Sequence, residues 1–143
     1  MREYKITDNC VIYNDMPRGW AKGKTQPIWH RKVYTMWYNM WARCYKFEEH
    51  NSKYYFDCEV DNTFKYLSIF LKWIEQQPYF EDFCLTCSNT MWSVDKDFIE
   101  RGNKIYTPSL IRLCTQRDNS LERISRKGSP MLNKSVSDKS KNL

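Results

Sequence analysis

The chain has 143 residues, of which 41% are hydrophobic and 28% are charged, a composition typical of one globular domain with its own core. It contains no run of about 18 apolar residues, so we expect no membrane span. The first residues, MREYKITDNC, lack an apolar signal segment. We therefore expect a cytoplasmic protein whose six cysteines stay reduced.

The net charge of +6 is unevenly distributed. Residues 1–50 carry nine Lys/Arg and five Asp/Glu, residues 51–122 carry eight and eleven, and residues 123–143 carry six and one. Positive charge at both ends favours a polyanionic partner such as nucleic acid, with a solubilising tail as the alternative. The aromatic share of 16% supplies rings for a core, and rings also stack on bases or fill pockets of partner proteins.

Residues 1–27 are rich in turn formers and predict an extended, loop-rich arm. Residues 28–46 follow Pro27 and place apolar side chains at spacings of three and four, which predicts an amphipathic helix. Its inward face is Trp29, Val33, Trp37, Met40, Trp41 and Cys44. A loop and a short strand in 47–60 precede a second helix at 61–77, which Asp61 or Asn62 caps and Pro78 ends.

Residues 79–90 predict a connector, and residues 91–115 predict a hairpin. The hairpin consists of strand 91–99, a turn at 100–103 and strand 104–115. A third helix is expected from about Thr115, with Leu121 and Ile124 facing inward, and the tail 128–143 is basic and expected to be disordered. The predicted fold is a small α+β single domain over residues 28–127, with two aromatic-rich helices followed by a hairpin-helix unit.

Cys84 and Cys87 have the C-x-x-C spacing of metal ligands, but the chain has no second C-x-x-C pair. A zinc site would have to recruit other ligands from Cys44, Cys58, His30 and His50. Buried thiols that act as small hydrophobic side chains are the alternative, and both histidines are expected on the surface.

The hairpin contains the triplet Asp95-Lys96-Asp97. Side chains alternate along a strand, so Asp95 and Asp97 are expected on one side and Lys96 on the other. Asn119 lies early in the third predicted helix, where it could turn back toward the hairpin. Two carboxylates and an amide suit Mg²⁺. The alternative is a charged hairpin face with Asn119 as a capping or packing residue.

Four motifs follow one another in a recognisable order. They are WYNMWARCY (37–45), YFDCEV (55–60), a helix with Phe64, Phe70 and Trp73, and VDKDFIERGNKIYTP (94–108), after which QRDNSL places Asn119. This order, across about residues 10–140, resembles a family of small phage HNH-type homing-endonuclease-like proteins, in a variant that carries Asp-Lys-Asp.

The resemblance implies a ββα-metal unit that meets double-stranded DNA in the host-cell cytoplasm, and a Mg²⁺-dependent endonuclease or nickase activity. It implies Asp95, Lys96 and Asn119 as catalytic residues, and Asp95, Asp97 and Asn119 as metal ligands. Lys96 stands where active HNH enzymes have a water-activating histidine, and a protonated amine cannot accept a proton. The alternative hypotheses are therefore an inactive scaffold that binds nucleic acid or a host protein, and a remnant without activity.

Relatives in this family often continue into a small three-stranded DNA-binding domain like that of plant ethylene-response factors. The end of this chain, KGSPMLNKSVSDKSKNL, resembles the start of that continuation, and we expect the module to be missing. DNA would then be bound through its phosphates, without sequence preference. The expected contacts are Lys96, Arg101, Lys104, Arg112, Arg117, Arg123, Arg126 and Lys127.

Overall fold

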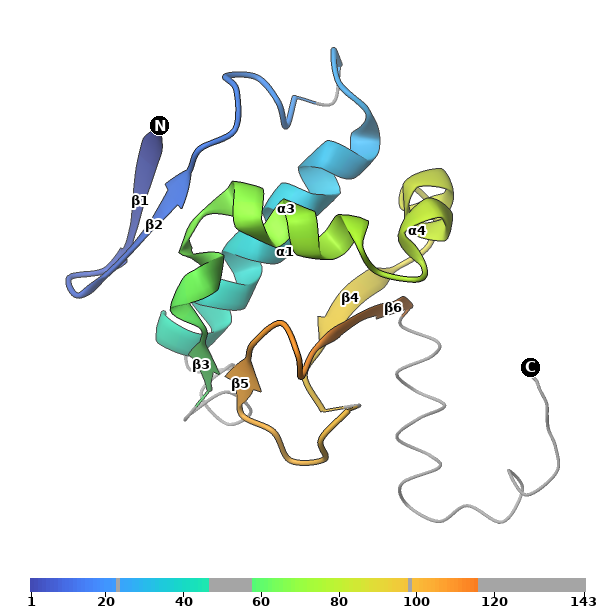
Figure 1. The fold of residues 1–143 in the computed structure, drawn as a ribbon. Helices are drawn as coiled ribbons and strands as arrows, with labels where there is room; N and C mark the ends of the chain where they lie inside the picture. The colour runs from blue at the N-terminus through green and yellow to red at the C-terminus, as the bar shows by residue number, and fades with distance from the viewer. Residues whose placement is uncertain (23, 47–57, 98, 116–143) are drawn as a thin grey trace, which may run out of the picture.

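The computed structural model describes residues 1–22, 24–46, 58–97 and 99–115. In chain order the elements are β1 (Arg2–Thr7), β2 (Cys10–Asn14), α1 (Ile28–Tyr45), β3 (Glu59–Val60), η1 (Asn62–Lys65), α3 (Leu67–Glu75), α4 (Phe80–Thr86), β4 (Trp92–Asp95), β5 (Ile105–Tyr106) and β6 (Arg112–Thr115). Figure 1 shows α1 and α3 at the centre, the β1–β2 hairpin on one side, and α4, β4 and β6 on the other. The fold is α+β, as the sequence predicted. The predicted third helix and the basic tail lie outside the described residues.

Helix α1 confirms the aromatic stripe that the sequence predicted. It begins directly after Pro27, and its buried side chains are Val33, Trp37, Met40, Trp41 and Cys44. Trp29, which was also predicted to face inward, is only partly buried. The indole Nε1 atoms of Trp37 and Trp41 both donate to the carbonyl oxygen of Phe64, at 2.7 and 3.1 Å. Large rings can be buried here because each polar N–H has a partner in η1.

The predicted second helix is divided in two. Asp61 caps η1 by accepting a hydrogen bond from the Thr63 backbone N–H at 2.8 Å, as expected for a capping residue. Tyr66 is extended, with φ −102° and ψ 126°, so α3 begins only after it. Tyr66 bridges to Tyr13 of β2, and the two rings stack with centroids 5.0 Å apart. Pairing with the N-terminal hairpin therefore interrupts the helix, a contact that local spacing cannot reveal.

The N-terminal residues form a hairpin rather than a loop-rich arm. β1 and β2 pair antiparallel, with Tyr4 opposite Ile12, and only the residues after β2 run as turns. Ile6, Cys10 and Ile12 are buried in the core, so the hairpin is an integral layer of the fold. The carboxylate of Asp15 accepts a hydrogen bond from the Ser68 backbone N–H at 2.8 Å and links the chain after β2 to the start of α3.

Two further predictions need correction in the second half of the chain. The connector 79–90 contains helix α4, which buries Phe83. The predicted strand 104–115 is two strands: β5 pairs parallel with β3, and β6 pairs antiparallel with β4. Between them, the Thr107 hydroxyl donates to Asp61 at 2.9 Å and the Pro108 carbonyl accepts from Trp73 Nε1 at 3.3 Å. These two hydrogen bonds direct the chain away from a continuous strand. None of the helices in the described ranges is both long and apolar enough to cross a membrane.

Candidate functional site

Asp95 is the last residue of β4, and its side chain is only 10% exposed. Its register partner on β6 is Arg112, and the distance from Asp95 Oδ2 to Arg112 Nε is 3.9 Å. Asp95 Oδ1 accepts a hydrogen bond from the Asp97 backbone N–H at 3.1 Å. Opposite charges across an antiparallel pair stabilise the sheet. Oδ1 therefore has a hydrogen-bond partner in the turn, whereas the buried Oδ2 has the long contact with Arg112 and no hydrogen bond among the described residues.

Lys96 and Asp97 lie beyond the end of β4, so the side-chain alternation of a strand does not apply to them. The Lys96 Nζ atom is 3.4 Å from Asp97 Oδ1, which brings together two side chains that the sequence placed on opposite sides. The Lys96 side chain is 11% exposed, and that of Asp97 is 33% exposed. The triplet thus forms a turn in which each charge lies close to an opposite one.

Asn103 holds this turn in place, and its role was missed in the sequence. It is one of two buried polar residues in the described chain, and its amide donates to the carbonyl oxygens of Lys96 and Ile105, at 2.8 and 2.7 Å. Its carbonyl oxygen accepts from the Ile105 backbone N–H at 3.1 Å. Gly102 precedes it with φ +79°, in the left-handed region that favours glycine. The G-N-K motif within the family resemblance was the available signal.

In the described part of the hairpin, both carboxylates expected to bind Mg²⁺ have a basic side chain nearby. The guanidinium of Arg112 lies beside Asp95, and the ammonium of Lys96 lies beside Asp97, so positive charge stands where the cation would be. Across the ranges described, no group of three or more His, Cys, Asp or Glu side chains is placed to hold a metal ion. Asn119, the third expected ligand, lies outside the described residues.

The C-x-x-C pair lies on α4 and just after it. Burial raises the pKa of Cys84 to about 11, and the charges of Cys87, Glu81 and Glu75 add to this. Burial likewise raises the pKa of Cys87 above its ordinary value. Cys87 is buried in the core and Cys84 packs against it, which favours the interpretation of these thiols as packing groups.

The other sulfur and imidazole candidates are also engaged in packing. Burial raises the pKa of Cys44 to about 12, with the adjacent Cys58 thiol contributing. His30 is partly covered rather than exposed, with its ring stacked on Trp20 at a centroid distance of 4.1 Å and its Nδ1 3.0 Å from the Trp20 carbonyl oxygen. His50 lies outside the described residues.

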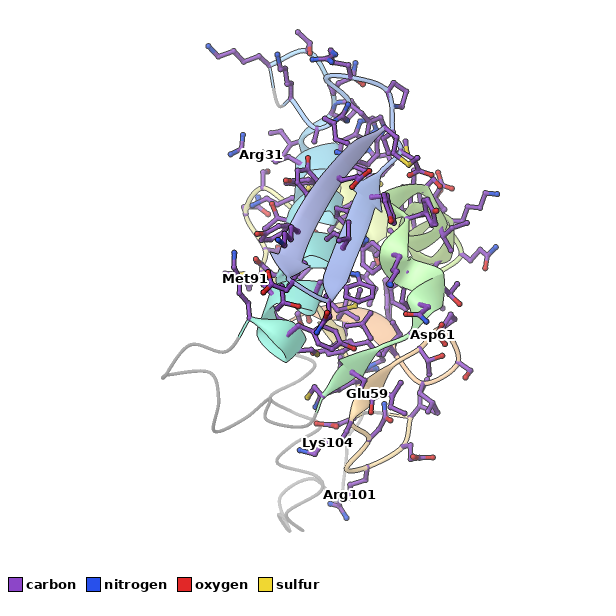
Figure 2. The ribbon with its side chains drawn as sticks, turned by 90° about the vertical axis from the view of Figure 1, so that its left-hand side faces the viewer. Arg31, Glu59, Asp61, Met91, Arg101 and Lys104 are labelled. Atoms are coloured by element: carbon purple, nitrogen blue, oxygen red, sulfur yellow. The ribbon has the colours of Figure 1, made fainter. Side chains whose placement is uncertain are left out.

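The basic residues expected at the DNA surface separate into two groups. Arg101 and Lys104 are exposed on the loop between β4 and β5, whereas Lys96 and Arg112 are largely covered beside their carboxylates. Figure 2 shows Arg101 and Lys104 at one end of the molecule and Arg31 near the other. Arg117, Arg123, Arg126 and Lys127 lie outside the described residues.

The first 46 residues hold most of the positive charge that the structure describes. They contain nine Lys/Arg and three Asp/Glu, so their net charge is 9 − 3 = +6. Two of the three acidic side chains have partners, because Asp8 pairs with Lys5 at 3.1 Å and Asp15 bonds Ser68. The sequence located this charge but assigned much of it to a loop-rich arm, whereas the fold packs it around β1, β2 and α1.

A hollow of about 200 Å³ lies between α1, α4 and β4. The charged residues that line it are Lys32 and Arg43 of α1, and its apolar lining includes Met36, Phe83 and Trp92. Lys32 and Arg43 lie outside the inward apolar face of α1, so the recess borders another face of that helix.

Comparisons with protein-family models, with curated proteins and with solved structures found no match to this chain.

Proposed function

We propose that this protein binds DNA through phosphate contacts, and that its acidic hairpin maintains the fold instead of cleaving the bound strand. The observation that carries the proposal is the net charge of +6 on residues 1–46, gathered on one hairpin, one helix and the segment between them. Such a surface attracts a polyanion and releases the counterions condensed on it. The expected setting is the cytoplasm of the cell that makes the protein.

A second contact is expected at the far end of the molecule. Arg101 and Lys104 are exposed on the loop that Asn103 holds in place, and Figure 2 shows them pointing away from the body of the protein. A fixed loop presents its cations with little loss of backbone entropy on binding. Contacts of this kind add affinity without selecting a base sequence.

The charge pairs of the hairpin favour binding over hydrolysis. Lys96 stands in the position where a nuclease of the HNH type needs a base, and its ammonium lies 3.4 Å from Asp97. Asp95 lies between Arg112 and the Asp97 backbone N–H. Lys96 is thus engaged with a carboxylate of the same turn, which supports a structural role for this side chain.

Binding is tested by fluorescence anisotropy of a labelled DNA duplex, measured with the full chain over a series of salt concentrations. The affinity should fall steeply with salt, and the double variant Arg101→Gln, Lys104→Gln should reduce the slope of log K against log salt by about 2. Lys72→Gln, which removes one exposed charge on α3, is the control, and the slope should change by well under half of the change in the double variant. If no duplex binds even at low salt, the proposal is wrong.

Cleavage is tested on supercoiled plasmid with Mg²⁺ or Mn²⁺. We expect no nicking above the background of a buffer control. Metal-dependent nicking that both Asp95→Ala and Asn119→Ala abolish would overturn the non-hydrolytic part of the proposal and restore the endonuclease hypothesis.

A further inference from the structure

A second hollow, an open pocket of about 310 Å³, lies where the β1–β2 hairpin, the segment 18–22 and α1 meet. Its volume is at the lower end of the range of small-molecule sites, roughly 300–1,000 Å³. Three of its lining side chains are cationic, three are aromatic, and none is acidic. The cations are Arg2, Arg18 and Lys22, and the rings belong to Tyr4, Trp20 and Tyr34.

Two consecutive turns bring the cations to the pocket. The Trp20 N–H donates to the Pro17 carbonyl oxygen, and the Lys22 N–H donates to that of Gly19, both at 3.0 Å. Gly19 has φ +82°, the conformation required at the third position of a type II turn, and other residues would be strained there. Arg18 therefore lies within the first turn and Lys22 at the end of the second, and both side chains line the pocket.

Arg2 reaches this segment from the other side. One of its terminal nitrogens donates to the Met16 carbonyl oxygen at 3.2 Å, which orients the guanidinium without neutralising it. Among the residues described, neither Arg2, Arg18 nor Lys22 forms an ion pair with a carboxylate. Three positive charges around one hollow repel one another, and an oxyanion would relieve this repulsion through charge-assisted hydrogen bonds.

The rings of the pocket are held in position by their neighbours. Tyr4 meets Tyr34 edge to face at 6.1 Å, and Trp20 stacks on His30. Burial alone would raise the pKa of Tyr4, but hydrogen bonds with Asn14, Tyr34 and Arg2 bring it below its ordinary value. Positioned rings offer flat apolar surface at little entropic cost, and nucleobases stack on such surfaces.

We propose that this pocket binds one nucleotide unit, with the phosphate held by Arg2, Arg18 and Lys22 and the base placed against Tyr4, Trp20 and Tyr34. Cations and rings together match a ligand that carries both an anionic and a planar aromatic part. The inference deepens the proposed function and rests on it, because it assigns one site within the basic N-terminal half to a nucleotide. A free mononucleotide and a nucleotide within a single strand present the same chemistry.

The ligand class is tested by isothermal titration calorimetry of the full chain with adenosine 5′-monophosphate, adenosine and inorganic phosphate. The monophosphate should bind at least about tenfold more tightly than either of its parts, because it engages both cations and rings. Phosphate binding as tightly as the monophosphate would show that the rings contribute nothing, and would overturn the nucleotide assignment. Adenosine binding as tightly as the monophosphate would show that the cations contribute nothing, and would also overturn the assignment.

The residues are tested with Arg18→Gln and Lys22→Gln, both at exposed positions where the fold should tolerate the change. Each should weaken binding of the monophosphate by about tenfold, because each removes a charged donor to the phosphate. Lys24→Gln is the matched control, since it removes the same charge two residues from Lys22 at a position that does not line the pocket. If Lys24→Gln weakens binding of the monophosphate by the same factor, the effect comes from overall charge and the proposed site is wrong.

The two sources of the nucleotide are separated with a labelled single-stranded oligonucleotide. Displacement of the strand by the monophosphate assigns the pocket to a nucleotide within a strand, and binding of the monophosphate without displacement assigns it to a free nucleotide. If the monophosphate does not bind at millimolar concentration while duplex DNA still binds in the same buffer, the pocket proposal is wrong and the proposed function stands. If the protein binds adenosine 5′-monophosphate but does not bind duplex DNA, the proposed function is wrong and the pocket proposal stands.

Discussion

The Asp95–Asp97 turn and the pocket beside Gly19 treat charge in opposite ways. In the turn, each acidic side chain lies within 4 Å of a basic one, at 3.9 Å from Asp95 to Arg112 and 3.4 Å from Asp97 to Lys96. In the pocket, the side chains of Arg2, Arg18 and Lys22 line a hollow that has no acidic lining. Charges that neutralise one another stabilise a local structure, whereas charges left uncompensated within the protein are available to a ligand.

The most conspicuous motif of the sequence is therefore not the place where the described structure gathers basic side chains without acidic ones. The Asp-Lys-Asp triplet attracts attention because carboxylates are potential metal ligands. Its side chains and backbone are nevertheless used by Arg112 and Asn103. The N-terminal segment looked like turns and a basic arm, yet it forms the pocket with the larger uncompensated charge.

The largest effect is expected in the core that joins the two regions. Trp37 is fully buried and donates to Phe64, so Trp37→Ala should lower the free energy of unfolding by about 3–5 kcal/mol. Trp37→Phe should cost less, because it keeps a ring and Trp41 still donates to the same carbonyl. Urea denaturation followed by circular dichroism measures both. A smaller loss for the alanine variant than for the phenylalanine variant would contradict this account of the core.

Destabilising the Asp95–Asp97 turn should leave ligand binding in the pocket unchanged. Asn103→Ala removes three hydrogen bonds at a buried site and should lower the free energy of unfolding by about 2–3 kcal/mol. Asn62→Ala, at an exposed position, is the control and should stay within about 0.5 kcal/mol. Under conditions where Asn103→Ala is folded, its binding of adenosine 5′-monophosphate should equal that of the wild type. A parallel loss of nucleotide binding would show that the two regions are coupled.

The interaction free energy between Asp95 and Arg112 is measured by a double-mutant cycle of Asp95→Asn and Arg112→Gln. The ion pair is long at 3.9 Å but largely covered, so a coupling free energy of about 0.5–1 kcal/mol is expected from urea denaturation. A coupling of zero would mean that Asp95 and Arg112 act independently, and would reopen a role for this carboxylate in binding a ligand.

The smallest effect concerns Asp61, which joins η1 to the chain after β5. Hydrogen bonds from the Thr63 hydroxyl and backbone N–H, aided by Thr107, hold the pKa of Asp61 below its ordinary value of 3.8 despite partial burial. The folded pKa is thus lower than the unfolded one. Ionised Asp61 therefore contributes to the free energy of unfolding at pH values above the unfolded pKa. This contribution is lost as the pH falls through the folded pKa.

Asp61→Asn should therefore reduce the fall in urea midpoint between about pH 6 and about pH 3 by a measurable fraction. The test is a pair of urea titrations of wild type and variant at each pH. Identical pH dependence in the two proteins would contradict the role given to these hydrogen bonds, and would leave acidic groups elsewhere as the source of the acid sensitivity.

Features that depend on neighbours along the chain were predicted well. Helix α1 begins directly after Pro27 and buries the side chains spaced at three and four, because that spacing follows from helix geometry. Asp61 caps its helix because an N-cap needs only its own next two or three residues. The antiparallel direction of β4 and β6 matches the predicted hairpin, but both strands are shorter than predicted, and the connection between them contains β5 instead of the tight turn at 100–103.

The features that were not predicted from the sequence depend on contacts between distant segments of the chain. β3 and β5 pair across more than forty residues, and Tyr66 interrupts a helix because it meets Tyr13. The pocket collects Arg2, the turn at 18–22 and Tyr34, which no periodicity associates. Spacing in the sequence encodes which face of an element is apolar, but the partner of that face depends on packing free energies summed over the whole chain. Helix α1 and the Asp61 cap could therefore be read locally, whereas the division of the second helix, the charge pairs and the basic pocket exist only in the folded protein.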